Sequence, residues 1–379
     1  MGTLNLKEDS FWQSYESFVL ANPRDAEAVA EAEVIRDWLV REEALTGHVL
    51  FRTSGSSGKG KWVALSKNSV LISARAVNEL LSVTKEDRWL QSLPLFHVGG
   101  MGIAARAYEA GCEVCGEYQK WNPVQFHETL EDGKITLTSM VPTQLVDLLR
   151  LKLTAPPSLR AILLGGGRLS DDLYQQAAGL GWPIRETYGM TETASQVATA
   201  AEGKRDLDIL PCWDVRSVDG GRLSIRGEAV MSFYLSVNDG GCTLSDPKQK
   251  GWFVTNDLGR VSEGVVSIKG RIDRCVKILG ELVNLVDVES AIGDVLRKRG
   301  AHNEVFAVVA EAGERESCSL VFCSEGGLND SNLLDEFNAG CNPLHRINRS
   351  VSLSKLPYTG IGKINYSELQ KYVQNDTGS

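Results

Sequence analysis

The residues best suited to chemistry form a run of glycines, hydroxyls and lysines at positions 53–61, between the apolar segments 50–51 and 63–65. Gly55, Gly58 and Gly60 can adopt positive φ and bring backbone N–H groups close to a ligand. Hydroxyl and ammonium groups add further donors. The side chains that supply them are Thr53, Ser54, Ser56, Ser57, Lys59 and Lys61. This combination is suited to binding phosphate oxygens.

Two interpretations of this run compete as phosphate sites. Gly55, Gly60 and Lys61 satisfy most of a Walker A pattern, but Trp62 stands where that pattern needs Ser or Thr for Mg²⁺. A Walker loop also opens a helix, whereas residues 61–66 are rich in strand-forming types. The pattern therefore predicts strand, loop, strand. A Gly/Ser hairpin that binds nothing is the remaining alternative on this stretch alone.

A second candidate segment, residues 186–195, places a carboxylate beside several hydroxyls directly after a predicted strand. The carboxyl ends of strands are where α/β proteins bind ligands. Glu192 in this segment can hold Mg²⁺ that is also bound to phosphates. A surface turn with a solvated glutamate is the alternative.

Two later segments each present a charged group on a loop or strand end. Asp257 and Arg271 together suit ribose hydroxyls, although they can equally form a structural ion pair. Residues 356–363 form a Pro/Gly loop that presents Lys363. A lone lysine on such a loop is ordinarily just solvated.

The elements that must position these residues follow an α/β pattern. Helical periodicity over residues 25–45 is followed by the strand, loop and strand, and Ser66 is a suitable N-cap for a helix to residue 81. Short apolar runs then alternate with helical patterns as far as a strand at 184–188, and Ser170 caps one of the helices. This alternation predicts an α/β layer architecture with much parallel strand pairing.

The remaining chain predicts a change of architecture. From residue 203 to 270, short strands and Gly/Asp turns indicate an added antiparallel β portion. Beyond Asp273 we expect a compact α+β domain, with Asp287 capping a helix that carries an apolar stripe to residue 296. The predicted domains are therefore residues 1–272 and 273–379.

Composition restricts the function classes. The 379 residues include 42% hydrophobic and 23% charged ones, and the formal charge of −9 argues against a general nucleic-acid binder. No apolar run is long enough to span a membrane, and residues 1–10 lack a secretory signal, so we expect a cytoplasmic protein without membrane insertion. The eight cysteines are expected to be reduced thiols; Cys112 and Cys115 form one close pair, without the second pair that a zinc site would need.

Taken together and in this order, these segments resemble the acyl-adenylate-forming superfamily, which includes acyl-CoA synthetases, adenylation domains of peptide synthetases, and luciferases. The resemblance runs from about residue 50 to residue 369. It implies a large N-terminal α/β domain and a small mobile C-terminal α+β domain. It also implies an enzyme that uses ATP and Mg²⁺ to adenylate a carboxylic acid, releases pyrophosphate, and transfers the acyl group to CoA.

The resemblance assigns roles to individual positions. Tyr188 would stack on adenine beside a glycine turn, Thr191 would meet phosphate, Glu192 would hold Mg²⁺, and Lys363 would bridge the substrate carboxylate and the α-phosphate. Asp273 falls at the family's hinge between the two domains. The nucleotide-binding positions that it implies are Thr53, Ser54, Gly55, Ser56, Ser57, Gly58, Lys61, Gly165, Gly166, Gly167, Tyr188, Gly189, Thr191, Asp257 and Arg271.

Four segments, 94–100, 139–145, 162–166 and 189–196, are similar to the o-succinylbenzoate:CoA ligases of menaquinone synthesis. The acyl-site positions that this implies are His97, Gly99, Thr143, Gln144 and Ser195, with His97 also counted among the catalytic residues. His97 stands where peptide-synthetase domains use Asp to hold an amino group, which disfavours an amino-acid substrate. A buried structural histidine is the alternative for His97. Another aromatic or medium-length acid, or a non-catalytic adenylate-binding relative, remains open for the whole chain, as does an oligomeric state.

The chain also departs from the family pattern in three places. Most members have Pro where Gly60 stands and Gly where Trp62 stands. Only 52 residues precede Thr53, whereas most members have a much longer region there. The resemblance therefore implies a shortened or condensed first subdomain.

Overall fold

The computed structural model describes the chain in segments and divides it into two compact units. The described residues are 6–42, 45–53, 60–238, 241–301, 304–312, 318–326, 331–359 and 362–376. One unit contains residues 1–255 and 260–267, and the other contains residues 256–259 and 268–379. The division therefore falls inside two strands, β15 (Phe253–Ser262) and β16 (Val265–Arg271).

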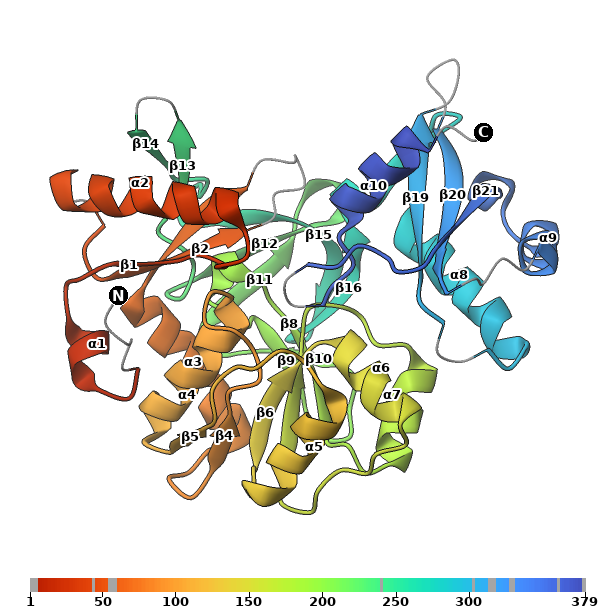
Figure 1. The fold of residues 1–379 in the computed structure, drawn as a ribbon. Helices are drawn as coiled ribbons and strands as arrows, with labels where there is room; N and C mark the ends of the chain where they lie inside the picture. The colour runs from red at the N-terminus through yellow and green to blue at the C-terminus, as the bar shows by residue number, and fades with distance from the viewer. Residues whose placement is uncertain are drawn as a thin grey trace. The chain divides into compact units, whose positions relative to one another are not determined.

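The first part of the larger unit is a five-stranded sheet in the order β1-β2-β3-β13-β14. Its strands are β1 (Phe18–Leu20), β2 (His48–Thr53), β3 (Lys61–Ser66), β13 (Phe233–Asn238) and β14 (Gly241–Ser245). Strands β2 and β3 pair antiparallel, which confirms the strand, loop and strand predicted around residues 53–61. Helix α1 (Asp9–Gln13) precedes the sheet, and α2 (Ala26–Glu42) lies along it in Figure 1. Ile35 of α2 packs with Leu50 and Trp62 of the sheet.

The second sheet has eleven strands in the order β11-β12-β15-β16-β10-β9-β8-β7-β6-β4-β5. Besides β15 and β16, its strands are β4 (Arg88–Leu90), β5 (Glu113–Cys115), β6 (Leu137–Met140), β7 (Ala161–Leu164), β8 (Ile184–Tyr188), β9 (Ala198–Ala200), β10 (Leu207–Ile209), β11 (Trp213–Ser217) and β12 (Arg222–Gly227). Pairing is parallel from β8 through β5 and antiparallel between β8, β9 and β10. Both predicted textures, parallel α/β and then antiparallel β, are confirmed.

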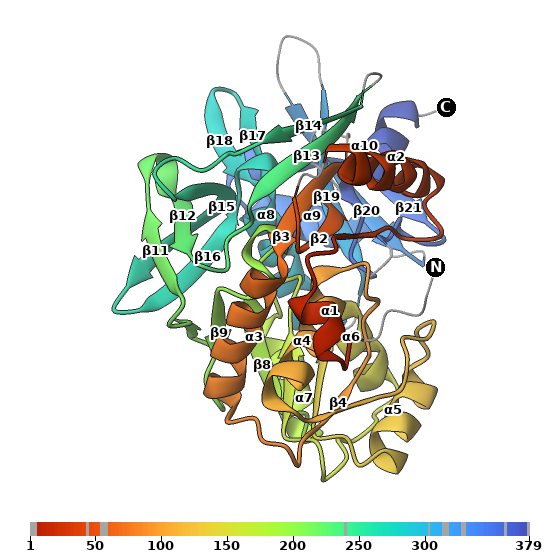
Figure 2. The same cartoon turned by 90° about the vertical axis from the view of Figure 1, so that its left-hand side faces the viewer.

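One helix follows each strand from β3 to β7 in the chain, and these helices cover the parallel strands. They are α3 (Lys67–Leu81), α4 (Val98–Ala110), α5 (Pro123–Asp132), α6 (Pro142–Arg150) and α7 (Asp171–Gly179). Helix α3 packs on α4 (Figure 2), whereas α5 contacts α6 and α6 contacts α7. The predicted caps are confirmed, because Ser66 Oγ accepts from Ser69 N and Ser170 Oγ accepts from Leu173 N.

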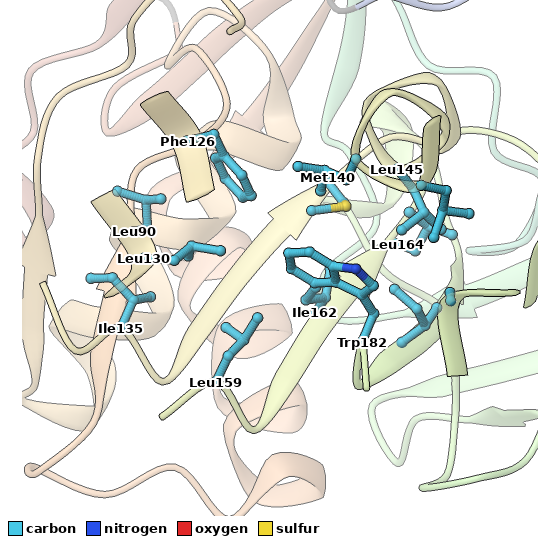
Figure 3. Close-up of a cluster of buried hydrophobic side chains, with 14 of the residues drawn as sticks. Leu90, Phe126, Leu130, Ile135, Met140, Leu145, Leu159, Ile162, Leu164 and Trp182 are labelled. Carbon is cyan, nitrogen blue, oxygen red and sulfur yellow. The ribbon is translucent and has the colours of Figure 1, made fainter. Parts of the chain in front are cut away.

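A core of buried apolar side chains lies between α5, α6 and the parallel strands (Figure 3). Phe126 and Leu130 come from α5, Leu145 from α6, and Ile162 from β7, while Trp182 precedes β8. Burying such side chains contributes roughly 1.5–3 kcal/mol each. The core therefore fixes where the carboxyl ends of β6, β7 and β8 lie.

An ion pair with one buried partner, the carboxylate of Asp87, joins the loops at the other end of these strands. Arg160 donates from Nε and Nη2 to the two carboxylate oxygens of Asp87, at 2.8 and 2.7 Å. Thr136 Oγ1 and Thr84 N donate to the same carboxylate at 2.7 and 2.9 Å. Burial raises the pKa of Asp87, but these hydrogen bonds outweigh it and lower the pKa to about 2.

This carboxylate predicts a defined pH dependence of stability. Because the pKa of Asp87 is lower in the folded state, its stabilisation is present above the ordinary value of 3.8 and is lost as pH falls towards 2. We expect Asp87→Asn to lower the free energy of unfolding at pH 7 by about 2 kcal/mol. In this variant, the free energy of unfolding should also fall less steeply between these two pH values. Urea unfolding of wild type and variant from pH 7 to 2 measures both, and parallel curves would contradict the prediction.

The second unit is built on a three-stranded sheet in the order β19-β20-β21. Its elements are β17 (Cys275–Ile278), β18 (Glu281–Asn284), α8 (Leu285–Lys298), β19 (Phe306–Ala312), β20 (Cys318–Glu325), α9 (Ser331–Gly340), β21 (Ile347–Leu353) and α10 (Tyr366–Asn375). The described residues also include short 3₁₀ segments: η1 (Thr191–Thr193), η2 (Asp219–Gly221), η3 (Ile272–Arg274) and η5 (Pro343–His345).

The two faces of this small sheet bury separate clusters. Val308 and Phe322 pack with α8 and α9, whereas Val309 and Val321 pack with Leu369 of α10. The alternation is the period-two pattern of a strand covered on both faces. The α+β architecture predicted beyond residue 273 is therefore confirmed.

One predicted cap is wrong. Asn284, not Asp287, caps α8, because the Asn284 side chain accepts from Val286 N and the helix already begins at Leu285. Asp287 instead lies in the first turn, where its negative charge interacts favourably with the positive end of the helix dipole. The exact domain boundary and the hinge at Asp273 stay predictions.

Candidate active site

The predicted phosphate loop connects β2 to β3, and its base is the last residue pair of this hairpin. Thr53 pairs with Lys61, and Thr53 Oγ1 donates to Lys61 O at 3.2 Å. The two ends of the loop are therefore held together by the hairpin. The other predicted loop residues, Ser54, Gly55, Ser56, Ser57 and Gly58, lie outside the described residues.

Arg52, directly before the loop, forms ion pairs with three carboxylates around α2. Its guanidinium lies 3.0 Å from Asp25, 2.7 Å from Glu27 and 2.8 Å from Glu31. A Cβ on Gly60 would come within 2.7 Å of Arg52 Nε, so the backbone at residue 60 passes close to the guanidinium. The absence of a side chain at residue 60 permits this approach.

Trp62 has a structural role that accounts for its departure from the family pattern. Its indole Nε1 donates to Glu31 at 2.9 Å, and the ring is buried in the core between α2 and the five-stranded sheet. The same carboxylate accepts from Arg52. Trp62 therefore anchors β3 to α2, the helix to which Arg52 also links β2.

Lys61 and Glu192 are brought to the same place by a residue that sequence reasoning missed. Tyr234 OH donates to Glu192 Oε1 at 2.8 Å, and Lys61 Nζ lies 5.1 Å from the centroid of the Tyr234 ring. Met231 N also donates to Glu192 O at 2.8 Å. The loop base and the predicted metal-binding carboxylate thus face one aromatic side chain of β13.

The arrangement at Glu192 fits a magnesium ion that is shared with a nucleotide. Within the described part of the chain, no three His, Cys, Asp or Glu side chains gather into a metal cluster. Mg²⁺ in nucleotide enzymes is commonly held by one or two carboxylates together with phosphate oxygens and water. Glu192 can supply such a carboxylate. Cys112 and Cys115 are free thiols, and burial raises the pKa of Cys112 to about 11 and also raises that of Cys115, which disfavours thiolate ligands.

The predicted adenine site lies at the carboxyl ends of β7 and β8. Gly165 N donates to Met140 O at 3.1 Å, and Gly166 has φ +88°. A Cβ on Gly165 would come within 2.9 Å of Thr187 Oγ1, so this glycine turn passes close to β8. Tyr188, which ends β8, is buried, with 8% of its surface exposed.

The chain after Tyr188 doubles back on itself. A Cβ on Gly189 would lie 1.9 Å from Ser195 O, so no other residue fits there without moving the backbone. Thr191 and Glu192 form the 3₁₀ turn η1, which is followed by Ser195 at φ +98°. This conformation, rare for a residue other than glycine, brings Ser195 back beside residue 189.

The predicted acyl-site residues lie at the starts of two helices. His97 is the N-cap residue of α4, and Gly99 lies in its first turn. Thr143 and Gln144 lie in the first turn of α6, where Gln144 Oε1 accepts from Val141 N at 3.0 Å. Since this oxygen caps the helix, Gln144 can offer a ligand its amide N–H groups.

Arg106 is a second residue that sequence reasoning missed. It lies on α4 and is 2% exposed, and its Cζ lies 5.3 Å from the Trp89 ring centroid. Among the described residues, neither Nε nor Nη1 has a hydrogen-bond partner. A Cβ on Gly102 would lie 2.9 Å from Arg106 Nη2 and 3.6 Å from Ser195 Cβ, so this guanidinium lies near the predicted acyl-site serine.

Burial of this cation has an energetic consequence. Burial alone lowers the pKa of Arg106 to about 9. A buried charge without a partner is strongly unfavourable, so the site is suited to an incoming anion. The sequence signal was a single arginine in a helix otherwise made mostly of glycine, alanine and apolar residues.

In the smaller unit, Arg271 joins two predicted site residues. Its Nη1 donates to Asp257 Oδ1 at 3.1 Å, while Nε and Nη2 donate to the two oxygens of Asp273 at 2.9 and 2.7 Å. The ion pair that the sequence left open between Asp257 and Arg271 is therefore present. It does not preclude the ribose role, because a carboxylate can accept several hydrogen bonds.

Lys363 is joined to Thr359 by two hydrogen bonds in the same unit. Thr359 N donates to Lys363 O at 2.7 Å, and Lys363 N donates to Thr359 Oγ1 at 3.2 Å. Burial lowers the pKa of Lys363, and the positive charge of Arg271 lowers it further. The lysine therefore lies in the electrostatic field of the residue that also contacts Asp257.

Comparison with known proteins defines the family. Residues 19–235, more than half of the chain, match the family of AMP-binding enzymes. This chain therefore belongs to the AMP-binding enzyme family. The 2-succinylbenzoate–CoA ligase of Enterococcus faecalis is 31% identical over 259 residues, which are 63% of this chain and 52% of that protein. The chain thus spans about half the length of this relative.

Solved structures show the same mixed α/β adenylate-forming fold, with a large N-terminal and a small C-terminal domain. A variant of MenE from E. coli with bound OSB-AMS has a TM-score of 0.73 and 29% identity over 87% of this chain and 69% of that one. The o-succinylbenzoate CoA synthetase of Bacillus subtilis with the acyl-adenylate intermediate OSB-AMP has a TM-score of 0.71 and 25% identity over 85% and 68%. The B. subtilis protein has also been solved with ATP and magnesium ion, with a TM-score of 0.71 and 24% identity over 85% and 69%.

No helix among the described residues is both long and apolar enough to cross a membrane. The cytoplasmic location expected from the sequence stays a prediction.

Proposed function

We propose that this chain is an ATP-dependent acid:CoA ligase that converts o-succinylbenzoate to o-succinylbenzoyl-CoA, a step of menaquinone biosynthesis. The observation that carries the choice of acid is the buried, incompletely paired guanidinium of Arg106 beside Gly102 and Ser195. o-Succinylbenzoate has two carboxylates, of which only one is activated. The other can pair with Arg106 and compensate its buried charge.

Adenylation requires two negatively charged partners to approach. A carboxylate oxygen of the acid attacks the α-phosphorus of ATP, the acyl-phosphate bond forms, and pyrophosphate leaves with the electrons of the broken P–O bond. Lys363 neutralises charge on the carboxylate and the α-phosphate, while Lys61 and Thr53 bind the phosphates that leave. Mg²⁺ held by Glu192, with Thr191 beside it, would neutralise phosphate charge further.

The other site residues hold the nucleotide and the acid. Tyr188 and the glycine turn 165–167 bind adenine, and Asp257 with Arg271 binds the ribose hydroxyls. His97, Gly99, Thr143, Gln144 and Ser195 surround the acid. In the second step the thiol of CoA, after losing its proton, attacks the acyl carbonyl, the thioester forms, and AMP leaves. Rotation of residues 273–379 about Asp273 would withdraw Lys363 between the steps.

A matched pair of acids tests this proposal. 3-Benzoylpropionate has the same activated chain and ring as o-succinylbenzoate but lacks the ring carboxylate. We expect acid-dependent pyrophosphate release from ATP with o-succinylbenzoate, and a CoA thioester when CoA is added. We expect kcat/KM for 3-benzoylpropionate to be at least about 10²-fold lower, because it leaves Arg106 unpaired.

Three outcomes would contradict the proposal in different ways. Equal rates with both acids would remove the role of the second carboxylate and leave another aromatic acid as substrate. AMP binding without pyrophosphate release from ATP in the presence of any acid would indicate a non-catalytic relative. ADP formed without an acid would indicate a phosphate-releasing ATPase, because adenylation yields AMP and pyrophosphate.

A further inference from the structure

Arg205 is the centre of a polar cluster that no part of the proposed reaction uses. It lies between β9 and β10, and its Nε and Nη2 donate to the two oxygens of Glu186 at 2.6 and 3.0 Å. Nη2 also donates to Leu169 O at 2.5 Å, and Nη1 pairs with Asp171. Its Cζ lies 4.9 Å from the ring centroid of Tyr174.

These partners belong to two segments that form the predicted adenine site. Glu186 lies on β8, two residues before Tyr188. Leu169 and Asp171 lie just beyond the glycine turn 165–167, at the start of α7. One guanidinium therefore ties the segment that follows the glycine turn to the strand that ends in Tyr188.

The contacts to Glu186 and Leu169 are the ones that hold these segments. The Glu186 side chain is 14% exposed, and its bidentate pairing fixes the plane of the guanidinium. Asp171 is 96% exposed, so its ion pair with Arg205 contributes little. The carbonyl of Leu169 accepts from the same guanidinium, which holds the end of the glycine-turn segment near Glu186.

We propose that Arg205 is a positioning residue for the nucleotide, which holds the 165–171 segment against β8 so that the adenine site is formed before ATP arrives. Arg205 itself touches no reacting atom. Without it, the segment would be ordered only on binding, and that ordering would weaken nucleotide affinity. The inference depends on the proposed nucleotide site but not on the identity of the acid.

Direct binding of AMP tests the proposal without turnover. We expect Arg205→Met to weaken AMP binding by about 10-fold in titration calorimetry, corresponding to about 1.4 kcal/mol. In kinetics, KM for ATP should rise while kcat and KM for the acid change less than about twofold. Arg205→Lys should recover part of the lost AMP affinity, because one ammonium group can replace some of the hydrogen bonds that the guanidinium donates.

Arg185→Met is the matched control, because Arg185 lies on β8 directly before Glu186. Arg185 pairs with Glu202, which is 89% exposed, at 3.2 Å, and neither residue lies next to the glycine turn. We expect this variant to bind AMP like wild type. The double variant Arg205→Met with Glu186→Gln should bind AMP no more weakly than the single variant with the lower AMP affinity. Both substitutions remove the same ion pair between Arg205 and Glu186.

Unchanged AMP affinity in a folded Arg205→Met protein would overturn the proposal. So would an equal loss of affinity for AMP and for the acid, because that pattern reports general damage to the fold. Wild-type protein that fails to bind AMP would also overturn it. If wild type binds AMP but activates no acid, the proposed ligase activity is wrong. AMP binding by the Arg205 variants then still tests the proposed role of Arg205.

Discussion

Lys363→Ala is expected to slow acid-dependent pyrophosphate release by about 10²- to 10³-fold, the scale for removing one preorganised donor from a developing charge. The backbone of Lys363 is held by hydrogen bonds to Thr359, and burial and Arg271 lower the pKa of the lysine. Because lysine is charged below its pKa, wild-type adenylation should decline with rising pH earlier than an ordinary lysine would allow. Pyrophosphate release measured from pH 6 to 10 tests both expectations.

Lys355→Ala is the matched control for this prediction. Lys355 lies in the same unit, with its Nζ 5.6 Å from the Tyr358 ring centroid, and its side chain is exposed. We expect this variant to release pyrophosphate like wild type. Supplied with preformed acyl-adenylate and CoA, Lys363→Ala should still form the thioester. Unchanged pyrophosphate release in Lys363→Ala would rule out the assigned role.

Arg106→Leu is expected to lower kcat/KM for o-succinylbenzoate by about 10²-fold or more, the effect of removing one partner of a buried charge pair. The stability of the protein without bound acid should not fall, because leucine replaces a buried cation whose Nε and Nη1 have no hydrogen-bond partner among the described residues. Replacing a buried charge by an apolar side chain is often neutral or stabilising. Thermal unfolding should therefore be unchanged or shifted upwards.

The acid that lacks a ring carboxylate separates charge pairing from general damage. Arg106→Leu should use 3-benzoylpropionate at least as well as wild type does. Arg75→Met serves as a surface control, because Arg75 is 59% exposed and pairs with Glu109 of α4. A variant that loses activity equally towards both acids would show that Arg106 supports the fold and does not select the substrate.

Local patterns predicted the elements well because they depend on neighbours in the chain. Ser66 and Ser170 cap helices through donors three residues away, and the β2–β3 hairpin follows from two apolar runs around one loop. Asn284 was missed because both it and Asp287 are good capping residues, and the pairing of β17 with β18 decides where α8 begins. A choice between two caps three residues apart is set by this tertiary context.

Contacts between distant segments could not be predicted in the same way. Tyr234 reaches Glu192 because β13 pairs with β3, a pairing between segments about 170 residues apart that leaves no local periodicity. Arg106 stood out in no motif, since its importance comes from burial and from missing partners. The resemblance to a family ordered the motifs along the chain, while the side chains that support them became visible only in three dimensions.

Arg271 joins two sequence segments of the smaller unit, and this limits where related proteins can exchange this region. It pairs with Asp257 on one side and with Asp273 on the other. A recombination point between residues 257 and 271 separates Arg271 from its first partner, and one between 271 and 273 separates it from its second. Related chains can therefore exchange their lysine-bearing ends without dividing these pairs by crossing over before Asp257 or after Asp273. Residues 257–273 are expected to be inherited as one block.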